Sequence, residues 1–586
     1  MPRAFAALVA ISVLSVTNAS ADVPPAPSYW TDSGIRDEGW PNTWNILGSD
    51  KFTITTAAEF GMFAHLLNSG AWSYFGCQAE LAADIDLSAH LWVPVIIDYT
   101  FSANAAPVCF NGNGHQIRGL RIDDSCCAGY PGVAGLFGEF DGGTISDLHL
   151  VDVSIQLTGH HYYEYVGGLA GSANDATIER VTVSGDISAP GGKGYWLKVS
   201  YNPNAVGGIV GTGSLIIIDD CLNTATVSGA ELVGGIIGCV FSDGQLSNLS
   251  NHGHISGDDY CIGGIVGGIY AGTVMNSLNT GVVTGETGGT GGISVGGIAG
   301  EFTIRSTPDT LDSYMANCWN GGDVMASDGS YVGGLVGWNR APIFNSYNTG
   351  SVTGNYCVGG VVGALVADNA LTIIADIRNV YSCGDVVGIS NVGSLMGKSD
   401  LPAQDFFFYS HWGTDHLAGA DPFGDAPGYP SFDVQNNLSA FAHEDLGDHS
   451  LLGDLNAWVN TNPSALTFTL KFWSERLDHG HMLPYLDGIG ATIEPPATGF
   501  AVPVIIKIEV VDNTTLTIAV SNCVATGLSY RLWATADLTQ SFAPFTAAGY
   551  PGTPVPWNSL EISDGIWVIE NIPMLGDRHF FKAAAE

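Results

Sequence analysis

Basic residues are scarce in this sequence of 586 residues. It contains 18 lysines and arginines against 57 aspartates and glutamates, which gives a formal net charge of -39 with histidine neutral. A charge of this size repels the phosphates of nucleic acids and the anionic headgroups of membranes. We therefore expect neither nucleic acid nor a membrane surface among its partners.

The chain has no long hydrophobic run after its N-terminal segment. None of the later stretches has the roughly 18 uninterrupted apolar residues of a membrane-spanning helix. The N-terminus itself has Arg3, an apolar run through Val16 and the small residues Ala19 and Ala21, which is the pattern of a secretory signal peptide. We expect a mature chain that starts near Asp22, has no transmembrane segment, and is secreted or held at a cell surface.

Cysteine is sparse for an exported chain, with eleven residues in 586. The count is odd and the positions are scattered, which argues against a dense disulfide framework. We expect most of the cysteines to be small buried residues of the core. Disulfide pairing is left open for Cys77 with Cys109, or with one of the vicinal Cys126 and Cys127.

The motifs of common catalytic sites are also missing. The chain has no His-Glu-x-x-His zinc motif, no Gly-x-Ser-x-Gly elbow and no Gly-x-x-x-x-Gly-Lys-Ser phosphate loop. His443 and His449 have the wrong spacing for a zinc helix, and His479 and His481 lack evident partner ligands. Acidic loops could bind calcium, but neither EF-hand spacing nor a glycine-aspartate nonapeptide array supports it. We therefore expect no metal and no cofactor.

Glycine, by contrast, is abundant, with 78 residues. Many lie in a phrase of one aliphatic residue, two glycines, two aliphatic residues and a glycine, which recurs in seven copies from residues 166–171 to 358–363. The copies start about 26 to 40 residues apart, a period that indicates a solenoid or similar array. Glycine is needed where coils approach closely or where φ is positive. The glycine pairs are Gly167 and Gly168, Gly207 and Gly208, Gly234 and Gly235, Gly263 and Gly264, Gly296 and Gly297, Gly333 and Gly334, and Gly359 and Gly360.

Asparagine recurs between the glycine phrases as Asn-x-x-Asn, for example Asn276 with Asn279 and Asn345 with Asn348. Asparagine side chains on successive parallel strands lie about 4.8 Å apart and can hydrogen-bond to one another in ladders. We interpret them as structural braces rather than as ligand contacts. With the apolar positions between the glycines, they predict three short strands per coil and an all-β fold, a parallel β-solenoid or β-helix.

Short motifs near the N-terminus carry a family resemblance. Residues 55–60 (Thr-Thr-Ala-Ala-Glu-Phe), 81–87 (Leu-Ala-Ala-Asp-Ile-Asp-Leu), 110–115 (Phe-Asn-Gly-Asn-Gly-His) and 135–138 (Gly-Leu-Phe-Gly), followed by the glycine phrases, strongly resemble GLUG-motif proteins. These are bacterial exported and surface proteins named for a short repeat found beside certain secreted peptidases. The resemblance covers roughly residues 51–490. It implies a surface-associated repeat domain, commonly linked with adhesion, and brings no catalytic residues.

Short helices are expected at both ends of the solenoid. Thr56 can cap the first, and the second begins near Ser450 and is ended by Pro463. A solenoid also needs caps over its terminal coils. The predicted division is residues 1–21, signal peptide; 22–50, N-terminal lead-in; 51–130, N-terminal cap and first coils; 131–400, GLUG-repeat β-solenoid; 401–493, C-terminal cap; 494–502, linker; and 503–586, a small antiparallel β-sandwich.

Two links between strands are enlarged and rich in aromatic residues. They occupy residues 160–165 and 191–201, each just before a glycine phrase, so stacking of the coils predicts that they lie side by side on one edge. They could form a platform for sugar rings or another protein, or simply cover their own hydrophobic residues. The candidate binding residues are Tyr162, Tyr163, Tyr165, Tyr195, Trp196 and Tyr201.

The leading hypothesis is a non-enzymatic exported β-solenoid that presents a surface for adhesion, matrix or glycan interaction. The alternative is a polysaccharide-active lyase or hydrolase that uses aspartate or glutamate in a solenoid groove. A carbohydrate-binding module without catalysis is a third possibility. The obvious carboxylate doublets are residues 123–124, 219–220 and 258–259, which we interpret as turn aspartates because adjacent strand residues point to opposite faces.

Overall fold

The computed structural model describes residues 27–40, 51–69, 78–97, 108–127, 132–158, 164–190, 204–286, 293–304, 313–327, 331–365 and 376–399, and shorter stretches between 407 and 585. The chain divides into two compact units, Met1–Ala491 and Thr492–Glu586. Each is described by itself. Among the described residues, no helix is long and apolar enough to cross a membrane.

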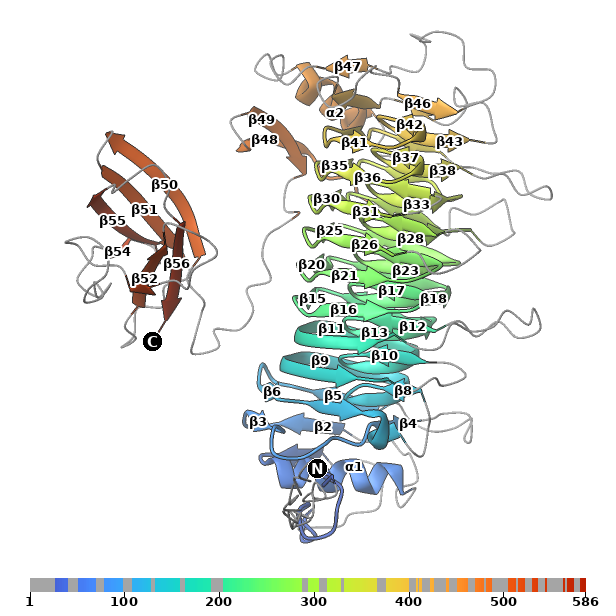
Figure 1. The fold of residues 1–586 in the computed structure, drawn as a ribbon. Coiled ribbons are helices and arrows are strands. Elements are labelled where there is room, and N and C mark those ends of the chain that lie inside the picture. The colour runs from blue at the N-terminus through green and yellow to red at the C-terminus, as the bar shows by residue number, and fades with distance from the viewer. Residues whose placement is uncertain are drawn as a thin grey trace, which may run out of the picture. The chain divides into compact units, whose positions relative to one another are not determined.

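The first unit is a stack of coils built from short parallel strands (Figure 1). In one coil the chain runs through β17, β18, β19, β20 and β21, and each of these strands pairs in register with its counterpart in the next coil. The prediction of a parallel β-solenoid is confirmed. The prediction of three strands per coil is wrong: there are five, because residues with positive φ, such as Asp243 and Asn248, interrupt the longer strands.

The strands stack in five columns. The glycine-pair column is β8 (Val133–Ala134), β10 (Tyr165–Gly167), β12 (Ala205–Gly207), β17 (Leu232–Gly234), β22 (Cys261–Gly263), β27 (Ser294–Gly296), β32 (Tyr331–Gly333), β37 (Tyr356–Gly359) and β42 (Ser390–Gly393). The second column is β4 (Val95–Ile97), β9 (Phe137–Gln156), β11 (Ala170–Ala189), β13 (Val210–Ser214), β18 (Ile237–Ser242), β23 (Val266–Ile269), β28 (Ala299–Phe302), β33 (Val336–Asn339), β38 (Val362–Leu365), β43 (Met396–Ser399) and β46 (Phe423–Asp425). The long strands β9 and β11 continue through the remaining columns.

The third column is β1 (Lys51–Ile54), β2 (Gln78–Leu81), β5 (Val108–Asn111), β14 (Ile217–Asp219), β19 (Gly244–Ser247), β24 (Gly272–Met275), β29 (Tyr314–Ala316), β34 (Ile343–Phe344), β39 (Ile377–Arg378) and β44 (Phe407–Phe408). The fourth is β3 (Ile85–Asp86), β6 (Gln116–Arg118), β15 (Leu222–Asn223), β20 (Ser250–Asn251), β25 (Leu278–Asn279), β30 (Trp319–Asn320), β35 (Tyr347–Asn348), β40 (Tyr381–Ser382), β45 (His411–Gly413) and β47 (Ser439–Phe441). The fifth is β7 (Arg121–Asp123), β16 (Thr226–Gly229), β21 (Ile255–Gly257), β26 (Val283–Gly285), β31 (Val324–Ala326), β36 (Val352–Thr353) and β41 (Val386–Val387).

The glycine phrase places two coils and an asparagine in close contact. A Cβ added to Gly264 would lie 2.1 Å from the carbonyl oxygen of Gly297 in the next coil and 2.4 Å from the side-chain carbon of Asn279. Neither neighbour can move away, because one is backbone and the other is buried. Glycine is therefore required here for close approach. The second glycines in the same situation are Gly208, Gly235, Gly297 and Gly334.

The predicted asparagine ladder exists in the interior of the solenoid. From Asn223 each side-chain amide donates to the side-chain oxygen of the next asparagine, with N to O distances of 2.7 to 2.8 Å. The members are Asn223, Asn251, Asn279, Asn320 and Asn348, all fully buried. Each amide also donates to the carbonyl two residues further on, which holds the turn that follows. This interior ladder ends at Ser382, which pairs with Asn348.

Helix α1 (Ala57–Asn68) lies at the N-terminal end of the stack. Thr56 and Glu59 form a complete capping box, so the predicted cap is confirmed. Phe60 and Phe63 are fully buried and contact Phe110 of β5, which extends the core under the first coils. In the lead-in, Trp30 and Trp40 are buried as expected, and Trp30 donates to the carbonyl of Leu87. The short 3-10 helix η2 (Asp124–Cys127) follows β7.

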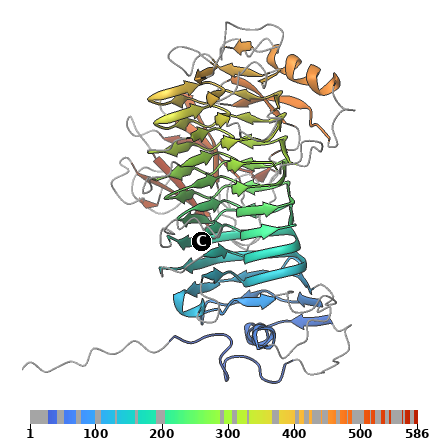
Figure 2. The same ribbon diagram turned by 90° about the vertical axis from the view of Figure 1, so that its right-hand side faces the viewer.

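Helix α2 (Ser450–Thr461) and the antiparallel hairpin of β48 (Trp473–Asp478) and β49 (His481–Leu486) pack along the side of the later coils. Their buried Leu455, Trp458 and Trp473 join a hydrophobic cluster with Leu278 of β25 and Tyr381 of β40. Figure 2 shows the helix beside the upper coils. We call residues 450–489 the strap. The parallel stack itself continues as far as β47.

The second unit contains only antiparallel sheets in its described residues. One has the order β50 (Val504–Asp512), β51 (Thr515–Ser521), β55 (Ile566–Pro573) and β54 (Ile562–Ser563). The other has β53 (Ala543–Pro544), β52 (Tyr530–Thr535) and β56 (Phe580–Ala585). The face-to-face packing of a sandwich stays a prediction.

None of the nine described cysteines is in a disulfide bond, and eight of them are buried. Cys77, the proposed partner for a disulfide, lies outside the described residues. Cys221 and Cys318 fill interior positions two residues before a ladder asparagine, where another coil has Ser346. Their role as small buried residues is thus the predicted one.

Candidate ligand-binding surface

Of the six aromatic residues predicted to bind a ligand, the described residues include one, Tyr165 of β10. Tyr162, Tyr163, Tyr195, Trp196 and Tyr201 lie outside them. The two enlarged links nevertheless lead into adjacent strands, because β10 and β12 pair in register with Tyr165 opposite Ala205. The side-by-side placement of the links themselves stays a prediction.

Tyr165 belongs to a cluster of four partly buried aromatic residues on the outside of the coils. The others are Phe241, Tyr260 and Tyr270. Phe241 in β18 and Tyr270 just after β23 stack with ring centroids 6.2 Å apart and an angle of 9° between their planes. We call these four residues the aromatic patch.

The floor of the aromatic patch is apolar and fully packed. It consists of Ala205, Leu232, Cys239 and Cys261, which are at most 2% exposed. The four aromatic residues pack against this floor and stay partly exposed. This is the usual construction of a site that stacks on flat apolar ligand surfaces, such as the faces of sugar rings.

Tyr260 adopts a strained backbone conformation. Its φ is +66°, in the left-handed region, which costs a bulky residue about 1–2 kcal/mol. The Asp259 carboxylate accepts a hydrogen bond from the Tyr260 backbone N–H at 2.9 Å and supports this conformation. Strain of this kind at a surface aromatic residue favours a functional role for the patch over a purely structural one.

A buried carboxyl group lies beside the aromatic patch. Glu301 of β28 is 8% exposed, and its oxygen accepts a hydrogen bond from the Cys261 thiol at 3.2 Å. Burial raises the pKa of Glu301 above its ordinary value, and the hydrogen bond from Cys261, followed by the positive charge of Arg340, opposes this only in part. Burial, followed by the Glu301 charge, also raises the pKa of Tyr270. A buried carboxyl group with a raised pKa therefore lies at the margin of the patch.

The sequence did not reveal Phe241, Tyr260, Tyr270 or Glu301 as site residues. Phe241 and Glu301 lie in β18 and β28, whereas Tyr260 just precedes β22 and Tyr270 just follows β23. The four residues therefore lie beside three different copies of the glycine phrase. The signal that could have found them is the alternation of inward and outward residues: Cys239 and Phe241 occupy outward positions of β18, and Glu301 is the outward residue of β28 two coils further on.

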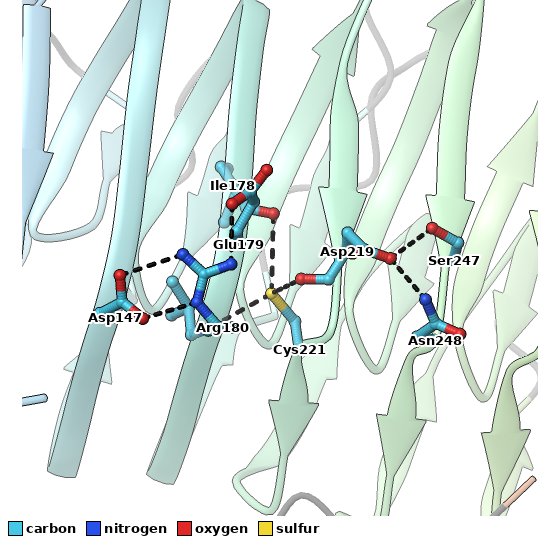
Figure 3. Close-up of polar contacts among 9 residues, drawn as sticks. Asp147, Ile178, Glu179, Arg180, Asp219, Cys221, Ser247 and Asn248 are labelled. Carbon is cyan, nitrogen blue, oxygen red and sulfur yellow. Dashed lines mark hydrogen bonds and ion pairs between the residues drawn. The ribbon is translucent and has the colours of Figure 1, made fainter. Parts of the chain in front are cut away.

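The carboxylate doublets serve turns and contacts between coils. The Asp219 carboxylate accepts from the Ser247 hydroxyl at 2.5 Å and the Asn248 amide at 2.7 Å (Figure 3). Asp220 has a φ of +53°, and burial followed by the Asp219 charge raises its pKa. The other two doublets behave similarly: Asp123 and Asp124 accept from nearby backbone N–H groups, as does Asp259.

One coil earlier, the counterpart of Asp219 and the residues next to it form an ion-pair network. The Arg180 guanidinium donates to both oxygens of Asp147 at 2.6 and 3.0 Å and to Glu179 at 2.8 Å (Figure 3). These hydrogen bonds from Arg180 lower the pKa of Asp147. Within the described residues, no three histidine, cysteine, aspartate or glutamate side chains are grouped to hold a metal ion.

Stacked parallel strands, glycine pairs at the contacts between coils and an internal asparagine ladder define this chain as a repeat-built β-solenoid. The family model "The GLUG motif" matches residues 162–188, which contain Tyr165 and the first glycine pair. The chain therefore carries a GLUG motif, which agrees with the resemblance seen in its sequence.

Two further proteins are similar to parts of the chain. "Halomucin" from Haloquadratum walsbyi is 30% identical over 200 residues, which is 32% of this chain and 2% of halomucin, so the match spans a very small part of that protein. A crystal structure of a proposed immunoglobulin A1 protease from Bacteroides ovatus aligns with 48% of this chain and 78% of its own, at 18% identity and a TM-score of 0.34.

Proposed function

We propose that this protein is an exported bacterial β-solenoid that binds glycans of a matrix or cell surface without cleaving them. The observation that carries the proposal is the aromatic patch of Tyr165, Phe241, Tyr260 and Tyr270 on a packed apolar floor. The patch begins at the strand into which the first enlarged aromatic link leads. The signal-peptide pattern and the resemblance to exported GLUG-motif proteins support a location outside the cell.

A rigid solenoid suits this role because it holds the binding surface in fixed geometry over its whole length. The patch needs no rearrangement of the backbone to present its rings. The high negative charge favours neutral glycans over polyanionic ones, because a polyanion would be repelled by the charge of -39.

The test is retention of the purified protein on a panel of immobilised neutral and acidic glycans. Phe241→Ala and Tyr270→Ala each remove half of the stacked pair, and we expect each to weaken binding about tenfold or more, as for a buried aromatic contact at an interface. Tyr356→Ala is the matched control, since Tyr356 is a tyrosine 53% exposed elsewhere on the solenoid. If Phe241→Ala and Tyr270→Ala are retained on the glycans as strongly as Tyr356→Ala and the natural protein, the patch is not the binding site.

The enlarged links are tested separately with Tyr163→Ala and Trp196→Ala. Weaker glycan retention would place these residues in the binding surface with the patch. Unchanged retention would exclude the links and leave the patch as the proposed site.

A second candidate function is glycan cleavage, which the buried Glu301 favours. A carboxyl group whose pKa is raised by burial is suited to act as a general acid near neutral pH. Incubation with the same glycans, followed by analysis for shortened products, tests this. Turnover by the natural protein that Glu301→Gln abolishes would replace the non-enzymatic proposal, whereas binding without products supports it.

A further inference from the structure

One corner of the solenoid holds a residue with positive φ in eight successive coils. This corner column consists of Asp147, Arg180, Asp220, Asn248, Asn276, Asn317, Asn345 and Asn379, with φ between 49° and 56°. Asparagine and aspartate tolerate this left-handed conformation better than most residues, which explains their enrichment here. The column lies on the outside of the corner between the third and fourth columns of strands.

The later part of the corner column binds the main chain of the strap. The Asn317 amide donates to the carbonyl oxygen of Thr469 at 3.0 Å, and the backbone N–H of Lys471 donates to the Asn317 oxygen at 3.1 Å. One coil further, the Asn345 amide donates to the carbonyl oxygen of Lys471 at 2.9 Å. These contacts fall on alternate residues of the strap and involve its peptide groups. The Trp473 side chain adds a hydrogen bond from its ring N–H to the Asn345 oxygen at 2.7 Å.

These asparagines also bond to one another. The amides of Asn317, Asn345 and Asn379 each donate to the preceding asparagine in the column, at 2.7 to 3.0 Å. Asn276 accepts from Asn317 and is the last member of this outer ladder. The positions of the amides are therefore fixed before a peptide binds, which lowers the entropic cost of binding.

The column continues beyond these coils with the same positive φ, and no described residue of the strap bonds to Asn276 or Asn248 there. Among the described residues, none accepts a hydrogen bond from the Asn276 amide, and Asn248 in the preceding coil is exposed. The Asn248 amide donates to Asp219, and Glu179 and Arg180 follow in the coil before (Figure 3).

The side chains beside the column change character at the same place. Where the strap binds, the third column of strands presents Phe344, and the fourth presents Tyr347. In earlier coils, the third column has Ser247, Asp219 and Glu179 at the position of Phe344. An apolar segment fits the first surface. A segment with positively charged side chains fits the second, because its charges meet carboxylates.

We propose that Asn276, Asn248, Asp219 and Glu179 form a docking track for an extended, lysine- or arginine-rich polypeptide segment of another protein. The track continues the interface that the protein already makes with its own residues 469–473. Peptide N–H and C=O groups of the partner bond to the asparagine amides, and its basic side chains pair with the two carboxylates.

The probe is a fluorescent peptide, Lys-Thr-Lys-Thr-Lys-Thr-Lys, measured by fluorescence polarisation with the full chain at about 50 mM salt, where charge attraction is little screened. In a second peptide the backbone nitrogens of the threonines are methylated, which keeps the charge of the peptide and removes three backbone N–H donors. We expect the methylated peptide to bind at least tenfold more weakly. The double variant N248G/N276G should lose a similar factor, because glycine accepts the left-handed backbone but lacks the amide.

Asn391→Gly is the matched control, since Asn391 also has a positive φ but lies outside the column. It should bind the peptide as the natural protein does. Should N248G/N276G fail to fold, E179Q/D219N replaces it, because it keeps the side-chain shapes while removing two charges, and it should weaken binding about tenfold. The proposal is overturned if the peptide does not bind, if methylation has no effect, or if the variants that fold retain full affinity.

Discussion

Removal of a single ladder asparagine should weaken the solenoid more than an ordinary polar substitution. Asn279 is fully buried and takes part in four hydrogen bonds: it accepts from Asn251 at 2.7 Å and from the Gly281 N–H at 3.2 Å, and it donates to Asn320 and to the Gly281 carbonyl at 2.8 Å each. Asn279→Ala removes all four. At about 1 kcal/mol per bond, the expected loss of unfolding free energy is about 4 kcal/mol.

The loss should be concentrated around the substituted coil, because each coil of a solenoid contacts only its neighbours. Hydrogen exchange measured by mass spectrometry is therefore the appropriate assay, together with urea unfolding. Amides in β20, β25 and β30 should exchange faster in the variant, while those of α1 should be unchanged. Thr353→Ala is the control, because Thr353 is an exposed residue of β36. A loss below about 1 kcal/mol, or equal effects of both substitutions, would refute the view that the ladder braces the core.

Three further outcomes are expected. Gly264→Ala should abolish the native fold or lower the yield of soluble protein, because its Cβ would lie 2.1 Å from a backbone oxygen, whereas Gly268→Ala should be tolerated, since its nearest neighbour would lie at 3.4 Å. Trp473→Ala should raise hydrogen exchange throughout the strap, with a loss of about 3–5 kcal/mol in docking but an intact solenoid, because Trp473 is 3% exposed and bonds to Asn345. Folding raises the pKa of Glu301, so its proton stabilises the folded state fully below the unfolded pKa, and this stability is lost as pH rises through the folded pKa. Urea unfolding should show the natural protein gaining stability relative to Glu301→Gln as the pH falls from 7 towards about 4.5.

The repeated elements were predictable because they are periodic in the sequence. The glycine pairs require close approach, and the Asn-x-x-Asn copies require a ladder where such coils stack. Both constraints recur in the five successive coils that hold Asn223 to Asn348. Asn279 and Gly264 show how they are linked, since the glycine leaves the space that the asparagine of the same coil fills. The capping box at Thr56 was equally readable, because it depends on residues only three positions apart.

The strap and the aromatic patch were not predictable in the same way. Asn317 and Thr469 are 152 residues apart, and the sequence around either residue does not indicate that the two are in contact. Phe241 and Tyr270 meet only because β18 and β23 pair in a particular register, which places their outward positions side by side. A shift of one residue would turn both rings to the opposite face. The sequence shows the period, but the register emerges from packing of the whole coil.

The same sequence motif also conceals two different roles. In Asn276-x-x-Asn279, the second asparagine donates along the interior ladder toward the C-terminus, whereas in the outer ladder Asn317 donates back toward Asn276. The interior members exchange hydrogen bonds with other parts of their own coils and are fully buried, so they can only brace. The outer members stand at a corner that described residues of the strap cover in some coils, whereas in other coils no described residue of the strap bonds to it. The coil that holds Asn276 contains members of both the interior and the outer ladder. The interior ladder and the proposed docking track therefore share this coil, and a ligand that binds there meets asparagine side chains whose positions the fold already determines.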